Sequence, residues 1–467
     1  MGQVNPKYEK CVVIENGKKV LYLQLLKALY GCVQSALLWY DLFTNTLVRM
    51  GYKLNPYNLC VANSQIKGKQ CTVAWYVNNN KISHVDDTVV ADIIEKFEAK
   101  FGKLTVTRGK HHVFLGMDIT FDDNNGTVTI LMKEYLKEAI ADSGMDASKV
   151  APTPAKKDLF TVDDVSEQLD KRQGEIFHSI VAKLLYVSKR ARTDAQLAIA
   201  FLCTRVSCST KQDWEKLIRL LRYFNGTLDM PLILGADSLT ESKSWVDAAY
   251  AVHDDMKSHT GGATSLGRGA IMCKSTKQKL NTKSSTEAEV VGSSDYLPNT
   301  VWARMFLAEQ GYKLTENIFY QDNQSAIRLE KNGRASCGQK SRHIDIRYFF
   351  MQDRFESEGI SVVYCPTDEM LADFFTKPLQ GSLFRKFRAV LLGHCHVKTL
   401  TRSPLPPSEE RVENPILEKV RSGGSGQTFA LPTKKKVSEQ MEVASALTYA
   451  SVLKKGLKLA PVAVHSF

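Results

Sequence analysis

The sequence predicts an α/β protein of the α+β kind, with strands and helices alternating along 467 residues. Three observations predict this class. Short runs of β-branched and aromatic residues end in polar turns, as in residues 71–81. Other segments repeat apolar residues at helical spacing, as in residues 214–223. Hydrophobic residues make up 43% of the chain and charged residues 24%, a balance typical of a protein with a packed core, and the length allows two or three domains.

Charge and cysteine usage narrow the class of protein. The formal net charge of +12 suits a polyanionic partner such as nucleic acid. Ten cysteines occur without a Cys-x-x-Cys pair, which predicts reduced thiols in an intracellular protein of the cytoplasm or nucleus. No apolar run approaches the length of a membrane span, and no signal peptide is visible at the start of the chain. A membrane protein is therefore excluded at this stage.

The first elements are a short strand pair and, after it, a helix predicted over residues 21–51. Five apolar positions fall on one face of this helix and predict core packing: Trp39, Tyr40, Phe43, Leu47 and Met50. Residues 71–81 then read Cys-Thr-Val-Ala-Trp-Tyr-Val-Asn-Asn-Asn-Lys, a strand that ends in a polar turn. By itself this turn is an ordinary hairpin, because asparagine tolerates a positive φ.

A helix and further strands follow the hairpin. Asp86 and Asp87 precede apolar residues at helical spacing, so they predict a helix N-cap rather than a metal site. Strands are predicted over residues 104–108, 113–121 and 128–131, with a turn of Asp-Asn-Asn-Gly between the last two.

A Pro-Thr-Pro run at residues 152–154 breaks both helix and strand and marks a boundary. Helices are predicted over 177–192, 194–205 and 214–223. The last is amphipathic and carries basic residues on its polar side: Lys211, Lys216, Arg219 and Arg222. These side chains either contact the phosphates of a duplex or form a solvated face, and the spacing fits both.

Residues 241–380 carry acidic residues at the ends of predicted elements. Asp247 ends a strand that reads Trp-Val-Asp, and residues 284–289, Ser-Ser-Thr-Glu-Ala-Glu, open a long helix. Asp322 lies between a strand and a helix in Tyr-Gln-Asp-Asn-Gln-Ser-Ala. Asp373 belongs to Met-Leu-Ala-Asp-Phe-Phe-Thr-Lys-Pro-Leu near the end of the region. The run of motifs is more specific than any single acidic residue.

These motifs resemble a known family. Residues 27–34, Lys-Ala-Leu-Tyr-Gly-Cys-Val-Gln, residues 76–79, Tyr-Val-Asn-Asn, and residues 113–117, Val-Phe-Leu-Gly-Met, resemble the reverse transcriptase palm of the copia-type LTR retrotransposon Pol polyprotein. Residues 241–380 resemble the RNase H domain of the same family. The resemblance implies a retrotransposon-derived chain that binds nucleic acid.

The resemblance also implies a domain order. Residues 1–150 would form a partial palm, residues 151–236 a helical thumb or connection region, and residues 237–388 an RNase H-like domain with a mixed sheet flanked by helices. Residues 389–467 include stretches rich in Pro, Gly and Ser, so they are predicted to form a disordered tail.

The polymerase site departs from the family pattern. The family has Tyr-Val-Asp-Asp where this chain has Asn78 and Asn79, and its remaining aspartate lies upstream of Leu-Tyr-Gly, where this chain has no aspartate before Asp41. A carboxamide lacks the charge that holds Mg²⁺ beside a triphosphate. We expect polymerase activity to be lost, and we expect the missing palm portion to come from a segment in cis or a partner in trans.

The nuclease site retains its acids. The resemblance assigns catalysis and binding of Mg²⁺ or Mn²⁺ to Asp247, Glu287, Asp322 and Asp373. Two-metal hydrolysis requires carboxylates that bridge the ions and complete each shell. Glu289 is the rival of Glu287, since residues two apart face different sides of a helix; Glu287 is preferred because it directly follows Ser-Ser-Thr. The expected function is cleavage of RNA in RNA–DNA hybrids, and the alternative is an inactive remnant that only binds nucleic acid.

Overall fold

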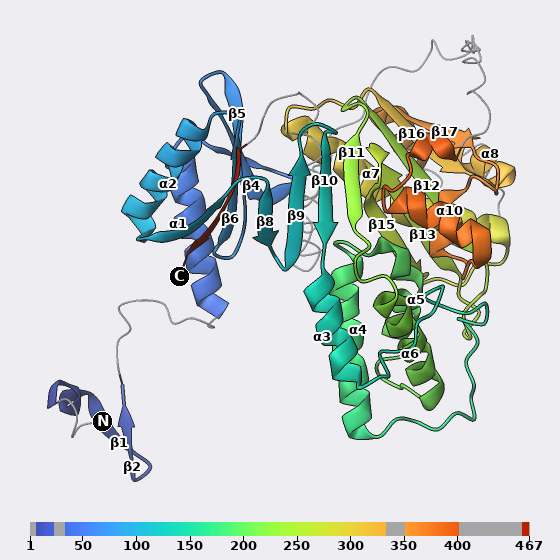
Figure 1. Ribbon diagram of the computed structural model, residues 1–467, viewed down its shortest axis with the longest axis horizontal. Coiled ribbons are helices and arrows are strands. Elements are labelled where there is room, and N and C mark those ends of the chain that lie inside the picture. Colours follow the sequence, from blue (N-terminus) through green and yellow to red (C-terminus); the bar gives the residue numbers. More distant parts are fainter. Residues whose placement is uncertain (1–5, 23–32, 333–350, 401–459, 467) are drawn as a thin grey trace, which may run out of the picture.

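The computed structural model describes residues 6–22, 33–332, 351–400 and 460–466. It confirms a fold of mixed helices and sheets (Figure 1). The chain opens with a short 3-10 helix, η1 (Pro6–Cys11), and with an antiparallel pair, β1 (Val12–Glu15) and β2 (Lys18–Leu21). Residues 27–32, which include the Leu-Tyr-Gly motif, lie outside the described residues.

The amino-terminal sheet has six strands in the order β3-β4-β5-β6-β18-β7. Its strands are β3 (Lys53–Asn55), β4 (Asn58–Ile66), β5 (Lys69–Tyr76), β6 (Asn79–His84), β7 (Leu104–Arg108) and β18 (Ala460–Ser466). Helices α1 (Val33–Arg49) and α2 (Asp87–Phe101) cover one face (Figure 1). The predicted inward face of α1 is confirmed, because Phe43 and Leu47 are fully buried against the sheet. The predicted cap is also confirmed, since Asp86 accepts a hydrogen bond from the Thr88 amide.

The hairpin of β5 and β6 turns at Val77 and Asn78, with Tyr76 paired to Asn79. The strand and turn are as predicted, but the reason given for the turn is wrong. Its positive φ falls on Val77, at 54°, rather than on an asparagine. A β-branched residue rarely adopts this conformation. The indole of Trp39 donates a hydrogen bond to the Val77 carbonyl at 2.6 Å, which ties the turn to α1.

The predicted strand over residues 113–121 is wrong, because it is two strands. β8 (His111–Phe114) and β9 (Met117–Asp122) form a hairpin with Phe114 paired to Met117. The turn residues Leu115 and Gly116 have φ of 55° and 73°. Two consecutive positive φ values define the type I′ turn, whose twist matches that of the flanking strands.

A second sheet joins segments far apart in the sequence. Its order is β14-β11-β10-β9-β8, with β10 (Thr127–Leu131), β11 (Leu232–Ala236) and β14 (Gly267–Arg268). Four helices pack together beside it in Figure 1: α3 (Lys133–Ser143), α4 (Lys171–Ser188), α5 (Gln196–Cys203) and α6 (Lys211–Asn225). Strands that precede the four helices in the sequence therefore share one sheet with strands that follow them.

Three of the four basic residues on α6 contact their own chain. Lys211 forms an ion pair with Glu167, Lys216 donates to the Thr161 carbonyl at 2.6 Å, and Arg219 donates to the Thr153 hydroxyl at 2.9 Å. The segment that begins at the Pro-Thr-Pro boundary thus lies along α6. Lys211 is exposed, as the solvated-face alternative predicts. Lys216 and Arg219 are half-buried against residues 55 and 66 positions away, a packing that neither alternative described.

The third sheet is mixed, as predicted, with the order β15-β13-β12-β16-β17. β12 (Glu241–Ala249), β13 (His259–Ser265) and β15 (Ala270–Lys277) are antiparallel, whereas β16 (Glu316–Gln321) runs parallel to β12 and to β17 (Ile360–Tyr364). Helix α7 (Ser285–Glu309) packs on one face and the 3-10 helix η4 (Leu371–Phe375) on the other. Helix α8 (Gln324–Asn332) follows β16 directly.

Two glycines in β13 allow these layers to approach. A Cβ atom on Gly262 would lie 2.3 Å from the ring of the buried Tyr296 in α7, and one on Gly261 would lie 2.7 Å from Thr376 after η4. Successive strand residues face opposite sides of a sheet. The adjacent glycines therefore bring α7 and η4 close to the two faces of the same strand.

We expect Gly262→Ala to destabilise the protein by about 1–3 kcal/mol, because the added methyl group overlaps a buried ring. Gly174→Ala is the matched control. Gly174 lies within helix α4, and a Cβ atom there would meet only the Ser209 hydroxyl, at 3.9 Å. That change should be neutral or stabilise by about 0.4–1 kcal/mol. Urea denaturation measures both, and equal midpoints for the two variants would contradict the close packing at β13.

The carboxyl-terminal segment is more ordered than predicted where the structure describes it. Helix α10 (Gly381–Leu391) continues past residue 388 and is followed by η5 (Val397–Thr399). Strand β18 pairs antiparallel with both β6 and β7. The expectation of a disordered tail from residue 389 is therefore wrong for these parts, and residues 401–459 lie outside the described residues. Within the described ranges, no helix combines the length and apolar character needed to cross a membrane.

Candidate metal centre in the mixed sheet

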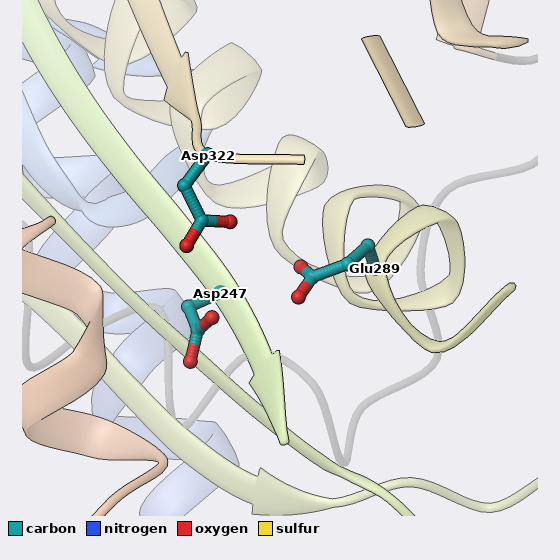
Figure 2. Close-up of side chains that lie close together, drawn as sticks. All are labelled: Asp247, Glu289 and Asp322. Carbon is teal, nitrogen blue, oxygen red and sulfur yellow. The ribbon is translucent and has the colours of Figure 1, made fainter. Parts of the chain in front are cut away.

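Three carboxylates from three elements meet at one edge of the mixed sheet. Asp247 comes from β12, Glu289 from the first turns of α7, and Asp322 from the residue after β16 (Figure 2). One oxygen of each lies within 4.8 Å of the others. The arrangement follows from topology, because β12 and β16 are adjacent and parallel and their carboxyl ends share an edge. Asp247 and Glu289 are buried and Asp322 is half-buried.

The preference for Glu287 over Glu289 is wrong on geometry. The Glu287 carboxylate accepts a hydrogen bond from the Lys283 amide at 2.7 Å, and its own amide donates to the Ser284 hydroxyl. Glu287 therefore helps to cap the start of α7. Glu289, two residues later, faces the sheet and joins Asp247 and Asp322. The signal was present in the sequence, because Ser-x-x-Glu before a helix is the capping-box pattern.

Asp373 lies beside the three carboxylates and is joined to them through a lysine. It belongs to η4, is buried, and accepts a hydrogen bond from the Lys377 ammonium at 2.8 Å. The same ammonium lies 3.6 Å from Asp247. The hydroxyl of Thr376 also donates to Asp247. Sequence reasoning missed Thr376 and Lys377, although the spacing of four between Asp373 and Lys377 is typical of an ion pair along a helical turn.

The carboxylates repel one another in a buried site. Burial first, and then Asp247 and Asp322, raise the pKa of Glu289 well above its usual range. Burial and Asp247 also raise the pKa of Asp322. For Asp373 the same two causes raise the pKa to about 7, although Lys377 offsets part of the rise. Burial and mutual repulsion therefore favour the protonated forms of these carboxyls, and Lys377 offsets only part of this effect.

A cleft of about 760 Å³ opens onto the carboxylates. Lys157 and Phe160, from the segment that follows the Pro-Thr-Pro boundary, form part of its wall, and Asn323 and Gln324 at the start of α8 form another part. The ligand set is all oxygen and carries net charge, which is the chemistry that Mg²⁺ and Mn²⁺ prefer. These residues therefore fit a hard divalent cation.

The hairpin that carries Asn78 and Asn79 has no comparable group. Across the residues that the structure describes, the cluster of Asp247, Glu289 and Asp322 is the one set of three or more acidic, histidine or cysteine side chains close enough to share an ion. Asn78, in the turn, and Asn79, the first residue of β6, are half-buried. Within the described residues, the carboxylate cluster therefore lies in the mixed sheet rather than at the hairpin.

Comparison with known proteins agrees with these motifs. Residues 8–157 match the family described as reverse transcriptase (RNA-dependent DNA polymerase). The chain is 26% identical over 388 residues to a retrovirus-related Pol polyprotein from transposon TNT 1-94 of Nicotiana tabacum, covering 81% of this chain and 28% of that protein. It is 27% identical over 371 residues to the Pol polyprotein from transposon RE1 of Arabidopsis thaliana, covering 78% and 24%. The chain thus spans about a quarter of the length of these relatives.

Among solved structures, the chain is similar to the crystal structure of the prototype foamy virus protease-reverse transcriptase. The two share 13% sequence identity with a TM-score of 0.23, over 81% of this chain and 43% of that one. A TM-score of this size supports no argument about the fold.

Proposed function

We propose that this chain is a reverse transcriptase-like region of a copia-type retrotransposon Pol polyprotein, which the matched family and the similar Pol polyproteins support, and that residues 237–388 act as an RNase H-type endonuclease. Its substrate would be the RNA strand of an RNA–DNA hybrid, and its cofactor Mg²⁺ or Mn²⁺. One observation carries the proposal: Asp247, Glu289 and Asp322 converge to within 4.8 Å and line the same cleft.

The residues of the site take distinct parts in this proposal. Asp247, Glu289 and Asp322 would hold the ions, which when bound activate water and stabilise charge on the scissile phosphate. Thr376 orients Asp247 through its hydrogen bond. Lys377, partly exposed at the cleft, holds Asp373 and offsets the local negative charge. Asp373 thus acts beside the cluster, through Lys377, rather than as one of the three converging ligands.

The proposal also holds that residues 1–150 lack polymerase activity. Asn78 and Asn79 cannot supply the charge that two metals and a triphosphate require, so residues 1–150 would serve as a palm without nucleotidyl transfer. A formal net charge of +12 favours the second candidate function, binding of nucleic acid without cleavage.

A labelled RNA–DNA hybrid separates the two candidates. We expect Mg²⁺-dependent cleavage by the full chain and loss of cleavage with Asp322→Asn, which keeps the shape of the side chain and removes its charge. No cleavage with either Mg²⁺ or Mn²⁺ would leave only the binding function. Primer extension on an RNA template should stay at the level of a no-enzyme control, and extension above that level would overturn the proposed loss of polymerase activity.

A further inference from the structure

Gln321 is a buried polar residue at the junction of two elements that carry the acidic cluster. It is the last residue of β16, its side chain has no exposed surface, and it directly precedes Asp322. Its carboxamide contacts α7 on one side and the turn after β16 on the other. The side chain does not contact the cleft, so the proposed function assigns it no part.

The contacts use both ends of the carboxamide. The amide nitrogen lies 3.4 Å from a carboxylate oxygen of Glu289 and 3.2 Å from the Ser293 hydroxyl, one turn further along α7. The amide oxygen accepts hydrogen bonds from the backbone amides of Asp322 at 2.9 Å and Asn323 at 3.0 Å. One side chain therefore links a carboxylate of α7 to the backbone that carries Asp322.

We propose that Gln321 is a positioning residue that sets the distance between Glu289 and Asp322 for metal binding. This proposal rests on the proposed metal-dependent function. Glu289 and Asp322 are 33 positions apart, on elements that could slide relative to each other. A carboxamide donates and accepts at the same time, which neither an apolar side chain nor an ionised carboxylate does. Outer hydrogen-bond partners of this kind orient the groups that contact the ion.

A purely structural role makes a different prediction. A buried polar link between β12 and β16 that lies away from the cluster provides the comparison. Ser242, five residues before Asp247 on β12, donates to the Asn317 side chain on β16 at 2.9 Å, and both residues are buried. Ser242→Ala removes a buried hydrogen bond between β12 and β16, at the ends of these strands that lie away from Asp247 and Asp322. It is therefore the matched control for a loss of stability without a loss of metal binding.

Calorimetric titration of the full chain with Mn²⁺, in the absence of substrate, tests the proposal. Gln321→Met keeps the length of the side chain and removes both polar ends, and we expect it to weaken the Kd for Mn²⁺ by about 10- to 100-fold. Ser242→Ala should leave the Kd within about twofold, although both changes remove a buried hydrogen bond and lower the thermal midpoint measured in EDTA.

A shorter side chain covers the case in which Gln321→Met does not fold. Gln321→Asn keeps the carboxamide but is one methylene too short to span both contacts, and we expect it to weaken Mn²⁺ binding by at least about threefold. A folded Gln321 variant with the wild-type Kd would overturn the positioning role. Wild-type protein that binds Mn²⁺ but does not cleave a hybrid would overturn the nuclease alone, and wild-type protein that binds no Mn²⁺ would overturn both.

Discussion

Glu289→Gln is expected to reduce the rate constant for hybrid cleavage by at least about 10³-fold, whereas Glu287→Gln should leave it within about twofold. The two residues differ in environment, since Glu289 joins Asp247 and Asp322 while Glu287 caps α7. Losing a charged metal ligand removes several kcal/mol of stabilisation, and each 1.36 kcal/mol is a factor of ten in rate. A glutamine at position 287 still accepts the amide hydrogen bond of the cap.

Single-turnover cleavage of a labelled hybrid at saturating Mg²⁺ measures this difference. Circular dichroism of both variants shows whether each remains folded. Glu287→Gln serves as the control, because it makes the same chemical change two positions away on the same helix. The reverse result, with activity lost in Glu287→Gln and kept in Glu289→Gln, would contradict the geometry of α7. It would support the sequence-based assignment of Glu287 to the metal position.

Asp194→Asn is expected to lower the free energy of unfolding by about 3–5 kcal/mol, because it leaves a buried arginine without its counterion. Arg192 and Asp194 are both about 1% exposed. The guanidinium of Arg192 donates two hydrogen bonds to Asp194, at 2.9 and 2.8 Å, and Tyr223 also donates to this carboxylate. Arg388 in turn donates to the Tyr223 hydroxyl at 3.2 Å.

The cluster of Arg192, Asp194, Tyr223 and Arg388 joins the helical region to α10. Tyr223 belongs to α6 and Arg388 to α10. Burial by itself would raise the pKa of Asp194, but Arg192 and then Tyr223 hold that pKa below its usual value. The carboxylate is therefore charged in the folded protein, and its removal leaves Arg192 uncompensated in the interior.

Urea denaturation measures the expected loss. Asp229→Asn is the matched control, because Asp229 forms a surface ion pair with Lys133 and its side chain is 76% exposed. Exposed pairs contribute about 0–1 kcal/mol, so this variant should stay close to the wild type. Comparable losses in both variants would show that burial of the Arg192 pair carries no special weight.

Local patterns predicted the elements that depend on nearby residues. The strand and turn at residues 71–81, the cap at Asp86 and the inward face of α1 all depend on contacts within a few positions or on one periodic face. The mixed sheet flanked by helices was instead implied by the resemblance of residues 241–380 to an RNase H domain. Periodicity and capping chemistry act over short distances, so they can be read from the sequence.

Errors arose where local signals competed or where partners came from distant segments. The helix cap and the metal position each need a glutamate from the first turns of α7, and the cap uses Glu287. Lys216 and Arg219 contact residues 55 and 66 positions away. The strand over 113–121 was divided by two positive φ values that a leucine and a glycine adopt.

The sequence by itself determined which acids this chain possesses, that amides stand at the hairpin, and which elements carry them. Only the tertiary structure decided that Glu289 rather than Glu287 faces Asp247 and Asp322, and that Gln321, Thr376 and Lys377 surround them. The physical reason is that a helix has many faces and a residue's partners depend on how that helix packs. The choice of face is made by the parallel pairing of β12 with β16 and by the close approach of α7 over Gly262.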